Sequence, residues 1–235
     1  MKKVFVFAFL NLFAFSLIAQ DTKNAGGMKP KVVLKNALDS ANYTYGVVAA
    51  SNAKRQMGED LKMDVFLAAF NATLNGETTL FNNEDAFRLF TEYSRQAQQR
   101  AIGKTKEEGR KFLAENKKRA GVVETASGLQ YEVMKKGTGA VSPKATDKVE
   151  VHYHGTMLDG TIFDSSVQRG QTATFGLNQV IKGWTEGVQY MKEGDKFKFF
   201  IPSDLAYGDR GAPGGKIKPG ATLIFEVELF KVIAQ

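Results

Sequence analysis

The sequence predicts an α+β protein in two parts, a helical arm followed by an antiparallel sheet packed on one short helix. Between residues 31 and 120, apolar residues recur at three- and four-residue spacing, which is the period of an amphipathic helix. From residue 121 onward, apolar and polar residues alternate over short segments between Gly- and Pro-containing turns, which is typical of strands. We therefore expect a helical domain at residues 21–120 and a second domain at residues 121–235.

The composition is ordinary for a globular protein, with 43% hydrophobic and 24% charged residues over 235 positions. The chain has no cysteine, which excludes disulfides, thiolate catalysis and cysteine-ligated metal sites. The formal net charge is +7, but residues 121–235 contain 13 basic and 13 acidic side chains. Because the basic excess lies on the helical segment rather than among clustered aromatics, nucleic-acid binding is not expected.

The first 20 residues have the features of a signal peptide. Lys2 and Lys3 precede an apolar run from Val4 to Ile18, and the small residue Ala19 offers a cleavage point. The run is shorter than the ~20 residues that a membrane-spanning helix needs. No cysteine follows it, so a lipoprotein is not expected. We expect cleavage near residue 19 or 20, a periplasmic location and no membrane span in the mature chain.

Three helices are expected in the arm. The segment 39–46 begins the first, and Asp64 is the expected N-cap of the second, which Asn75-Gly76 ends. Three apolar residues of the second helix would share one face: Phe66, Phe70 and Leu74. The third helix would open at residues 82–85 and continue to about Arg119.

Gly103 and Gly109 should lower the stability of the third helix. Along one face of this helix the side chains become smaller toward the carboxy terminus: Phe87, Phe90, Ser94, Ala97 and Ala101. A helix this long is difficult to bury within an arm of this size. Helices that are polar over most of their surface usually bridge separate bodies. The third helix is therefore predicted to be a stalk.

In the second domain, strands are expected at residues 127–134, 148–154, 172–177, 196–201 and 222–232. The alternation in the second strand would place Val149, Val151 and Tyr153 on one side of the sheet. A helix is expected at residues 179–191 with Asn178 as its cap. Residues 155–166, around an Asp159-Gly160 turn, and residues 203–220 are expected to be loops.

Aromatic residues gather in the stretch 151–184, together with the carboxylate of Asp164. They could line a hydrophobic cup: Tyr153, Phe163, Asp164, Phe175, Val180, Ile181 and Trp184. A cup with no nucleophile suits a reaction in which no bond is made or broken. Ser165-Ser166 lacks a suitably placed base, and His152 with His154 lacks a third metal ligand.

The same residues, with Gly183, the segment 206–208 and Phe225, closely resemble the FKBP family of peptidyl-prolyl cis-trans isomerases. The resemblance covers about residues 121–232 and implies a cup that binds proline. It implies catalytic roles for Asp164, Tyr207, Trp184, Phe163 and Tyr153, and substrate contacts from Phe175, Val180, Ile181, Phe225 and Ile217. It also implies that the cup is a possible binding site for macrolide inhibitors.

The resemblance assigns a part to each group. Trp184 would be the floor under the proline ring. The Tyr207 hydroxyl and the Ile181 backbone N–H would each bind a substrate carbonyl. Asp164 would lie where the rotating carbonyl passes and would orient Tyr153 by a hydrogen bond. No acid, base, metal or cofactor is required for this reaction.

The arm resembles the amino-terminal module of Mip-like FKBPs, whose helices interlock two subunits. The matching segments are Tyr45-Gly46, residues 66–76 and residues 109–122. A homodimer is therefore expected, against the alternative of a self-contained helical bundle in a monomer.

A binding function remains the serious alternative to the enzyme. A dimeric periplasmic chaperone could use two cups on a stalk to hold unfolded or proline-containing chains by avidity. A purely structural dimeriser would leave the aromatic series unexplained. Substitution of Trp184 by Leu separates the first two, because an enzyme would lose turnover while holding by the stalk would survive.

Overall fold

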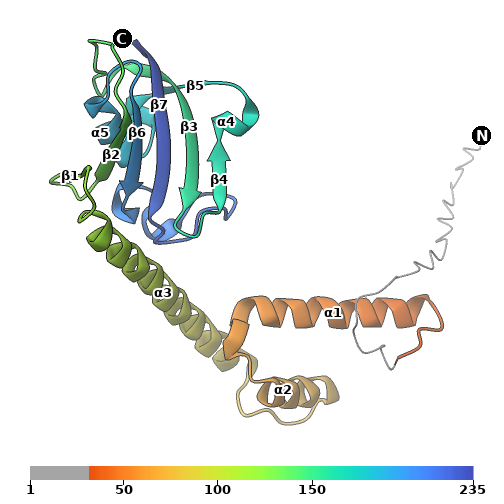
Figure 1. Cartoon of the computed structure of the whole chain (residues 1–235). Coiled ribbons are helices and arrows are strands. Elements are labelled where there is room, and N and C mark those ends of the chain that lie inside the picture. Colours follow the sequence, from red (N-terminus) through yellow and green to blue (C-terminus); the bar gives the residue numbers. More distant parts are fainter. Residues whose placement is uncertain (1–31, 235) are drawn as a thin grey trace, which may run out of the picture. The chain divides into compact units, whose positions relative to one another are not determined.

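The computed structural model describes residues 32–234, and Figure 1 shows its helices and strands. The chain divides into two compact units between residues 71 and 72. The expected signal peptide, residues 1–20, lies outside the described residues. Across residues 32–234, the helices are too short or too polar to cross a lipid bilayer.

Helix α1 (Ala37–Met57) lies in the first unit and begins two residues before the expected Asp39. The side chain of Asn36 caps it by accepting a hydrogen bond from the Asp39 backbone N–H at 2.8 Å. Gly58, with φ 55°, ends it. None of its residues is buried, and its largest exposed apolar side chains are Leu38, Tyr43, Tyr45, Val47 and Val48.

Helix α2 (Met63–Asn75) begins two residues earlier than predicted, so the assignment of Asp64 as its N-cap is wrong. Asp64 lies in the first turn, where its charge still favours the positive end of the helix dipole. Phe66 and Phe70 share a face as predicted, with ring centroids 5.8 Å apart. Gly76, with φ 69°, follows the last residue and confirms the predicted end.

Helix α3 (Asn83–Asn116) belongs to the second unit and is 34 residues long, which corresponds to about 50 Å. Asn82 caps it by accepting from the Asp85 backbone N–H, as the predicted start requires. The helix runs through both Gly103 and Gly109 without a break. It ends before the predicted Arg119.

The carboxy-terminal end of α3 is anchored to the sheet by a buried polar network. Asn116 donates to the side chain of Gln130 at 2.9 Å, and both side chains are buried. Gln130 in turn donates to the Leu113 carbonyl at 2.9 Å and to Glu124 at 2.8 Å. Buried polar groups that find partners on both sides fix one arrangement of the two elements. The end of the stalk helix is thus part of the folded unit that contains the sheet.

The strands form one antiparallel sheet, as predicted, in the order β1-β2-β6-β7-β3-β4, with β5 paired to β3. They are β1 (Val122–Glu124), β2 (Gln130–Lys135), β3 (Lys148–Met157), β4 (Ile162–Ser165), β5 (Ala173–Gly176), β6 (Lys196–Ile201) and β7 (Leu223–Ile233). The bounds of β6 are those predicted, and Val149, Val151 and Tyr153 are buried on one side of β3. Strand β1 was not predicted, because three residues are too few to show a period.

The prediction of a loop at residues 155–166 is wrong except for its turn. Strand β3 continues through Gly155, β4 pairs back on it, and a short helix α4 (Ser166–Arg169) follows. Gly155 is required there because a Cβ would lie 2.7 Å from the Phe163 ring. The predicted turn is present at Gly160, whose N–H donates to the Met157 carbonyl and whose φ is 82°.

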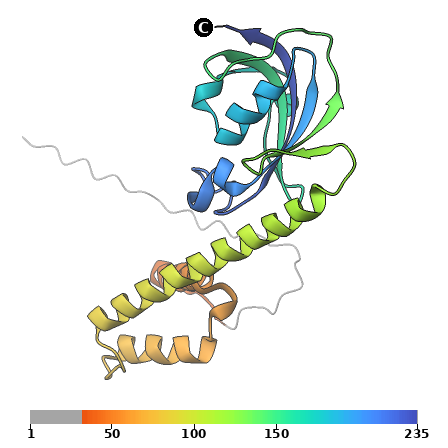
Figure 2. The ribbon, with the colours of Figure 1, turned by 90° about the vertical axis from the view of Figure 1, so that its left-hand side faces the viewer.

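The predicted helix at residues 179–191 is shorter than expected. Helix α5 spans Lys182–Gly187, between the 3-10 turns η2 (Leu177–Gln179) and η3 (Val188–Tyr190), and Asn178 does not cap it. Val180 and Ile181 are extended, so the chain passes the sheet before the helix begins. Figure 2 shows α5 lying against one face of the sheet, where the core packs.

Candidate functional site

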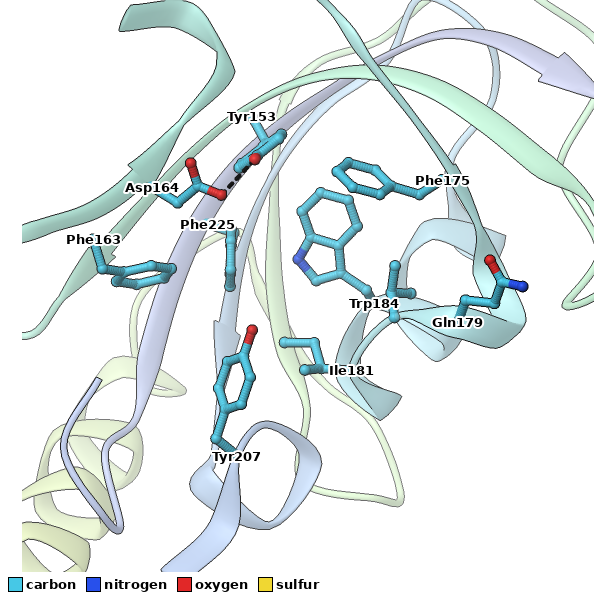
Figure 3. Close-up of a pocket in the computed structure, with 10 residues that line it drawn as sticks. Tyr153, Phe163, Asp164, Phe175, Gln179, Ile181, Trp184, Tyr207 and Phe225 are labelled. Carbon is cyan, nitrogen blue, oxygen red and sulfur yellow. Dashed lines mark hydrogen bonds between the residues drawn. The ribbon is translucent and has the colours of Figure 1, made fainter. Parts of the chain in front are cut away.

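A pocket of about 500 Å³ opens between α5, the sheet and the loop 203–220 (Figure 3). Strands β3, β4, β5 and β7, helix α5 with the segment before it, and the loop all contribute to its lining. The lining residues are Tyr153, Phe163, Asp164, Phe175, Gln179, Val180, Ile181, Trp184, Tyr207 and Phe225. The pocket is therefore mostly aromatic and aliphatic, with one carboxylate.

Trp184 is at the centre of the aromatic cluster and is only 4% exposed. Its ring meets Tyr153, Phe175 and Phe225 edge to face, with centroids 5.5, 5.7 and 5.3 Å away. Such T-shaped contacts are favourable beyond the area they bury. Gly183 permits this packing, because a Cβ there would lie 2.5 Å from Ile201. The indole is a rigid, apolar floor.

The buried indole nitrogen of Trp184 has no hydrogen-bond partner among the described residues. Phe163 and Phe225 meet at 80° with centroids 5.3 Å apart, and they form the wall opposite α5. A wall of aromatic rings offers few hydrogen bonds to water. The site is therefore suited to an apolar ring of ligand.

The polar side of the pocket is a cluster of three side chains. Tyr153 donates its hydroxyl proton to Asp164 at 2.5 Å, as the sequence predicted (Figure 3). Arg169, on α4, forms an ion pair with Asp164 and donates to the Tyr153 hydroxyl oxygen at 2.8 Å. Its guanidinium also lies 5.5 Å from the centre of the Tyr153 ring. The cluster holds the Tyr153 ring and the Asp164 carboxylate in one geometry.

The electrostatics keep this carboxylate charged. Burial raises the pKa of Asp164, but hydrogen bonds from Tyr153 and Arg169 outweigh it and leave that pKa below its ordinary value. Burial and the hydrogen bond to Asp164 raise the pKa of Tyr153. At neutral pH the pocket therefore holds an ionised Asp164 beside a neutral Tyr153.

Besides the Trp184 indole, the Tyr207 hydroxyl and the Ile181 backbone N–H at the pocket have no protein partner within residues 32–234. The Tyr207 side chain is 39% exposed, and its hydroxyl points into the pocket. The backbone N–H of Ile181 meets no acceptor, although the Ile181 carbonyl accepts from Trp184 and Thr185. Both groups are free to bond to a ligand.

All the predicted site residues line the pocket except Ile217, which is buried in the core beneath the loop. The sequence prediction missed Gln179, which lines the pocket, and Arg169. The position of Arg169, on the helical turn after the Phe163-Asp164 strand, was the available signal. His152 and His154 bond to Ser166 and Ser165 through their Nδ1 atoms, at 3.0 and 2.9 Å, outside the pocket.

Two family models match this chain. The model for FKBP-type peptidyl-prolyl cis-trans isomerase matches residues 139–230, and the model for the domain amino terminal to it matches residues 38–133. The FKBP-type peptidyl-prolyl cis-trans isomerase FkpA of Aeromonas hydrophila is 44% identical over 216 residues, which cover 86% of this chain and 79% of that protein. The peptidyl-prolyl cis-trans isomerase Mip of Coxiella burnetii is 38% identical over 208 residues, 85% and 88% of the two chains.

A solved structure gives the same result for the fold. The crystal structure of FkpA from Escherichia coli matches with a TM-score of 0.71 and 33% identity, over 86% of this chain and 99% of that chain. The match extends over the helical region and the sheet together, as both family models do. The chain therefore belongs to the FKBP-type peptidyl-prolyl cis-trans isomerases, in the class of FkpA and Mip.

Proposed function

We propose that this chain accelerates rotation about X–Pro bonds by binding the proline ring over Trp184 and favouring the twisted amide. The observation that carries the proposal is an apolar pocket with one carboxylate, in which the Tyr207 hydroxyl and the Ile181 N–H have no protein partner among the described residues. Rotation of a peptide bond meets a barrier of about 18–20 kcal/mol, because the planar amide is stabilised by resonance. The catalyst must therefore bind the twisted amide better than the planar one.

The low polarity of the pocket makes it bind the twisted amide better than the planar one. A planar amide is more charge-separated than a twisted one, so a dry aromatic pocket disfavours the planar ground state. In this proposal the Tyr207 hydroxyl and the Ile181 N–H donate to substrate carbonyls and hold the backbone on both sides of the proline. Asp164 fixes the Tyr153 ring and lies beside the path of the rotating carbonyl. No bond is made or broken, and no cofactor takes part.

A protease-coupled isomerisation assay on the mature chain from Asp21 tests the proposal, with a short peptide that carries an apolar residue before proline. Trp184→Leu, Asp164→Ala and Tyr207→Phe should each lower kcat/KM. Tyr190→Phe is the matched control for Tyr207→Phe, because it removes a hydroxyl from a half-exposed tyrosine outside the pocket. A folded wild-type chain without activity, or equal effects of the two tyrosine variants, would refute this mechanism.

We infer in addition that the chain acts as a homodimer on exported polypeptides. The leader at residues 1–20 supports export to the periplasm. Apolar side chains on α1 support a subunit contact, since Leu38 is 71% and Tyr45 is 73% exposed. Sedimentation should show a dimer that Leu38→Glu and Tyr45→Glu dissociate, while Ser51→Glu, also at an exposed position on α1, leaves it intact. A monomeric wild-type chain would refute the homodimer.

The exposed apolar residues of α1 also favour a second function, the holding of unfolded polypeptides. Trp184→Leu should abolish turnover of the peptide yet still suppress aggregation of an unfolded protein. If both activities fall together, the holding function depends on the pocket and not on the arm.

Binding of a macrolide ligand to the pocket would be seen as inhibition of the isomerase activity, and Trp184→Leu should weaken that inhibition.

A further inference from the structure

The stalk helix α3 contacts the loop that carries Tyr207. Lys106 of α3 places its Nζ 3.2 Å from Asp204 and 2.6 Å from Asp209. These two aspartates stand on either side of Tyr207, in the 3-10 turns η4 (Ser203–Leu205) and η5 (Gly208–Arg210). One lysine thus bonds to both turns that flank a residue of the pocket.

The ion pairs lie at the edge of a close packing contact. Ile102, Lys106 and Gly109 share one face of α3, by their helical spacing. A Cβ added to Gly220 of the loop would lie 3.0 Å from the Ile102 carbonyl oxygen and 3.1 Å from Lys106 Cγ. A Cβ at Gly109 would lie 2.2 Å from Thr222 Oγ1. There is no room for the loop to move toward the helix.

The two ends of the loop are bonded to each other as well. The Gly220 N–H donates to the Gly208 carbonyl at 2.9 Å, so the segment held by α3 is tied to the residue after Tyr207. Figure 2 shows the blue turns of this loop beside the end of α3. Within the part of the chain that the structure describes, no group bonds to the Tyr207 hydroxyl. The place of that hydroxyl is therefore set by its backbone, and the backbone is set in part by Lys106.

We propose that Lys106 is a positioning residue of the isomerase site, which fixes the Tyr207 hydroxyl in the pocket by bonding to Asp204 and Asp209. This inference rests on the proposed role of Tyr207 in binding a substrate carbonyl. The aspartates are 79% and 62% exposed, so the two ion pairs contribute little to the stability of the fold. Their effect is local, on the two turns around Tyr207. The stalk helix then completes the catalytic site as well as connecting it to the arm.

The test uses three variants of the full mature chain. Lys106→Met keeps an unbranched side chain against Gly220 but removes the charge, and Lys106→Arg restores it. Lys111→Met is the matched control, because Lys111 lies on the same helix, is largely exposed and faces Glu107 at 3.8 Å instead of the loop. We expect Lys106→Met to lower kcat/KM about three- to tenfold with an unchanged unfolding midpoint, and Lys106→Arg and Lys111→Met to stay near wild type.

A double substitution distinguishes positioning from a general structural effect. If Lys106 acts through Tyr207, Lys106→Met should have no further effect on kcat/KM in a Tyr207→Phe background. The same fold loss in that background would overturn the proposal. So would wild-type kcat/KM in Lys106→Met, or a loss that follows a lower unfolding midpoint.

A readout independent of turnover separates this inference from the proposed function. The NMR signals of the Tyr207 ring should shift in Lys106→Met and stay in place in Lys111→Met. If the wild-type chain has no activity and the signals still shift, the proposed function fails and the positioning stands. If the signals do not move in Lys106→Met, the positioning is refuted whatever the activity is.

Discussion

Alanine substitution of the two glycines of α3 compares an open position with a packed one. A Cβ at Gly103 would meet no atom within 4 Å. A Cβ at Gly109 would lie 2.2 Å from Thr222 Oγ1 and 3.2 Å from Thr222 Cβ. Thr222 is buried, so it has little freedom to withdraw. The same chemical change therefore meets opposite surroundings in one helix.

The expected magnitudes follow from two opposing effects. Alanine is favoured over glycine in a helix by about 1 kcal/mol, so Gly103→Ala should raise the free energy of unfolding by up to about that much. Gly109→Ala gains the same helix-propensity stabilisation, but overpacking against Thr222 costs about 1–3 kcal/mol. Its net effect should lie between neutral and a loss of about 2 kcal/mol. The gap between the two variants should be about 1–3 kcal/mol.

Urea unfolding followed by fluorescence measures this gap, because Trp184 is the only tryptophan of the chain and lies in the core next to the sheet. Thr222→Ala in the Gly109→Ala background removes the closest atom and should recover part of the loss. Equal stability of the two single variants would refute the docking of α3 against Thr222. A stabilised Gly109→Ala would do the same.

Three further changes test other parts of the unit. Arg169→Gln removes the guanidinium, whose hydrogen bond and charge both lower the pKa of Asp164, so NMR titration should show that pKa rising toward its ordinary value. Because a depressed folded pKa gives stability that is lost as pH falls through it, the variant should also lose less stability on acidification. Gly155→Ala would place a Cβ within 2.8 Å of two phenylalanine rings of the pocket wall, so we expect a loss of about 1–3 kcal/mol in urea unfolding together with lower kcat/KM. Asn116→Ala leaves the buried Gln130 oxygen without its donor and should cost about 1–3 kcal/mol by the same assay, with kcat/KM unchanged at temperatures where the variant is folded.

The sequence predicted the parts of this fold whose signals are periodic or local. The alternation in β3 is set by burial on one face of the sheet, and Val149, Val151 and Tyr153 are buried as that pattern requires. The start of α3 and the end of α2 were visible in Asn82 and Gly76, because capping is a short-range interaction. The aromatic series predicted the pocket because its order along the chain resembles that of the FKBP family. These features depend on neighbours in the chain.

The failures of prediction depend on contacts between distant segments. Val180 and Ile181 have side chains that a helix would accept, yet they are extended because they pass along the pocket before α5 begins. Ile217 was assigned to the pocket by the resemblance to the FKBP family, but the return of the loop onto Gly208 and α3 carries it into the core. Arg169 was overlooked because its partners are on β3 and β4. No local pattern predicts the extended backbone of Val180 and Ile181 or the burial of Ile217, and the only signal for Arg169 was its position shortly after Phe163-Asp164.

The glycines show most clearly why sequence alone falls short here. By helix propensity Gly103 and Gly109 are equivalent, and both should weaken the stalk. The structure separates them, because only Gly109 faces a neighbour, and there the missing side chain lets α3 approach Thr222, the residue just before β7. Gly183 gives α5 the same close approach to β6, and that approach places the next residue, Trp184, at the floor of the pocket. A residue that is unfavourable for the element containing it is thus what allows that element to reach the site, so its cost is local and its benefit lies in the tertiary contact.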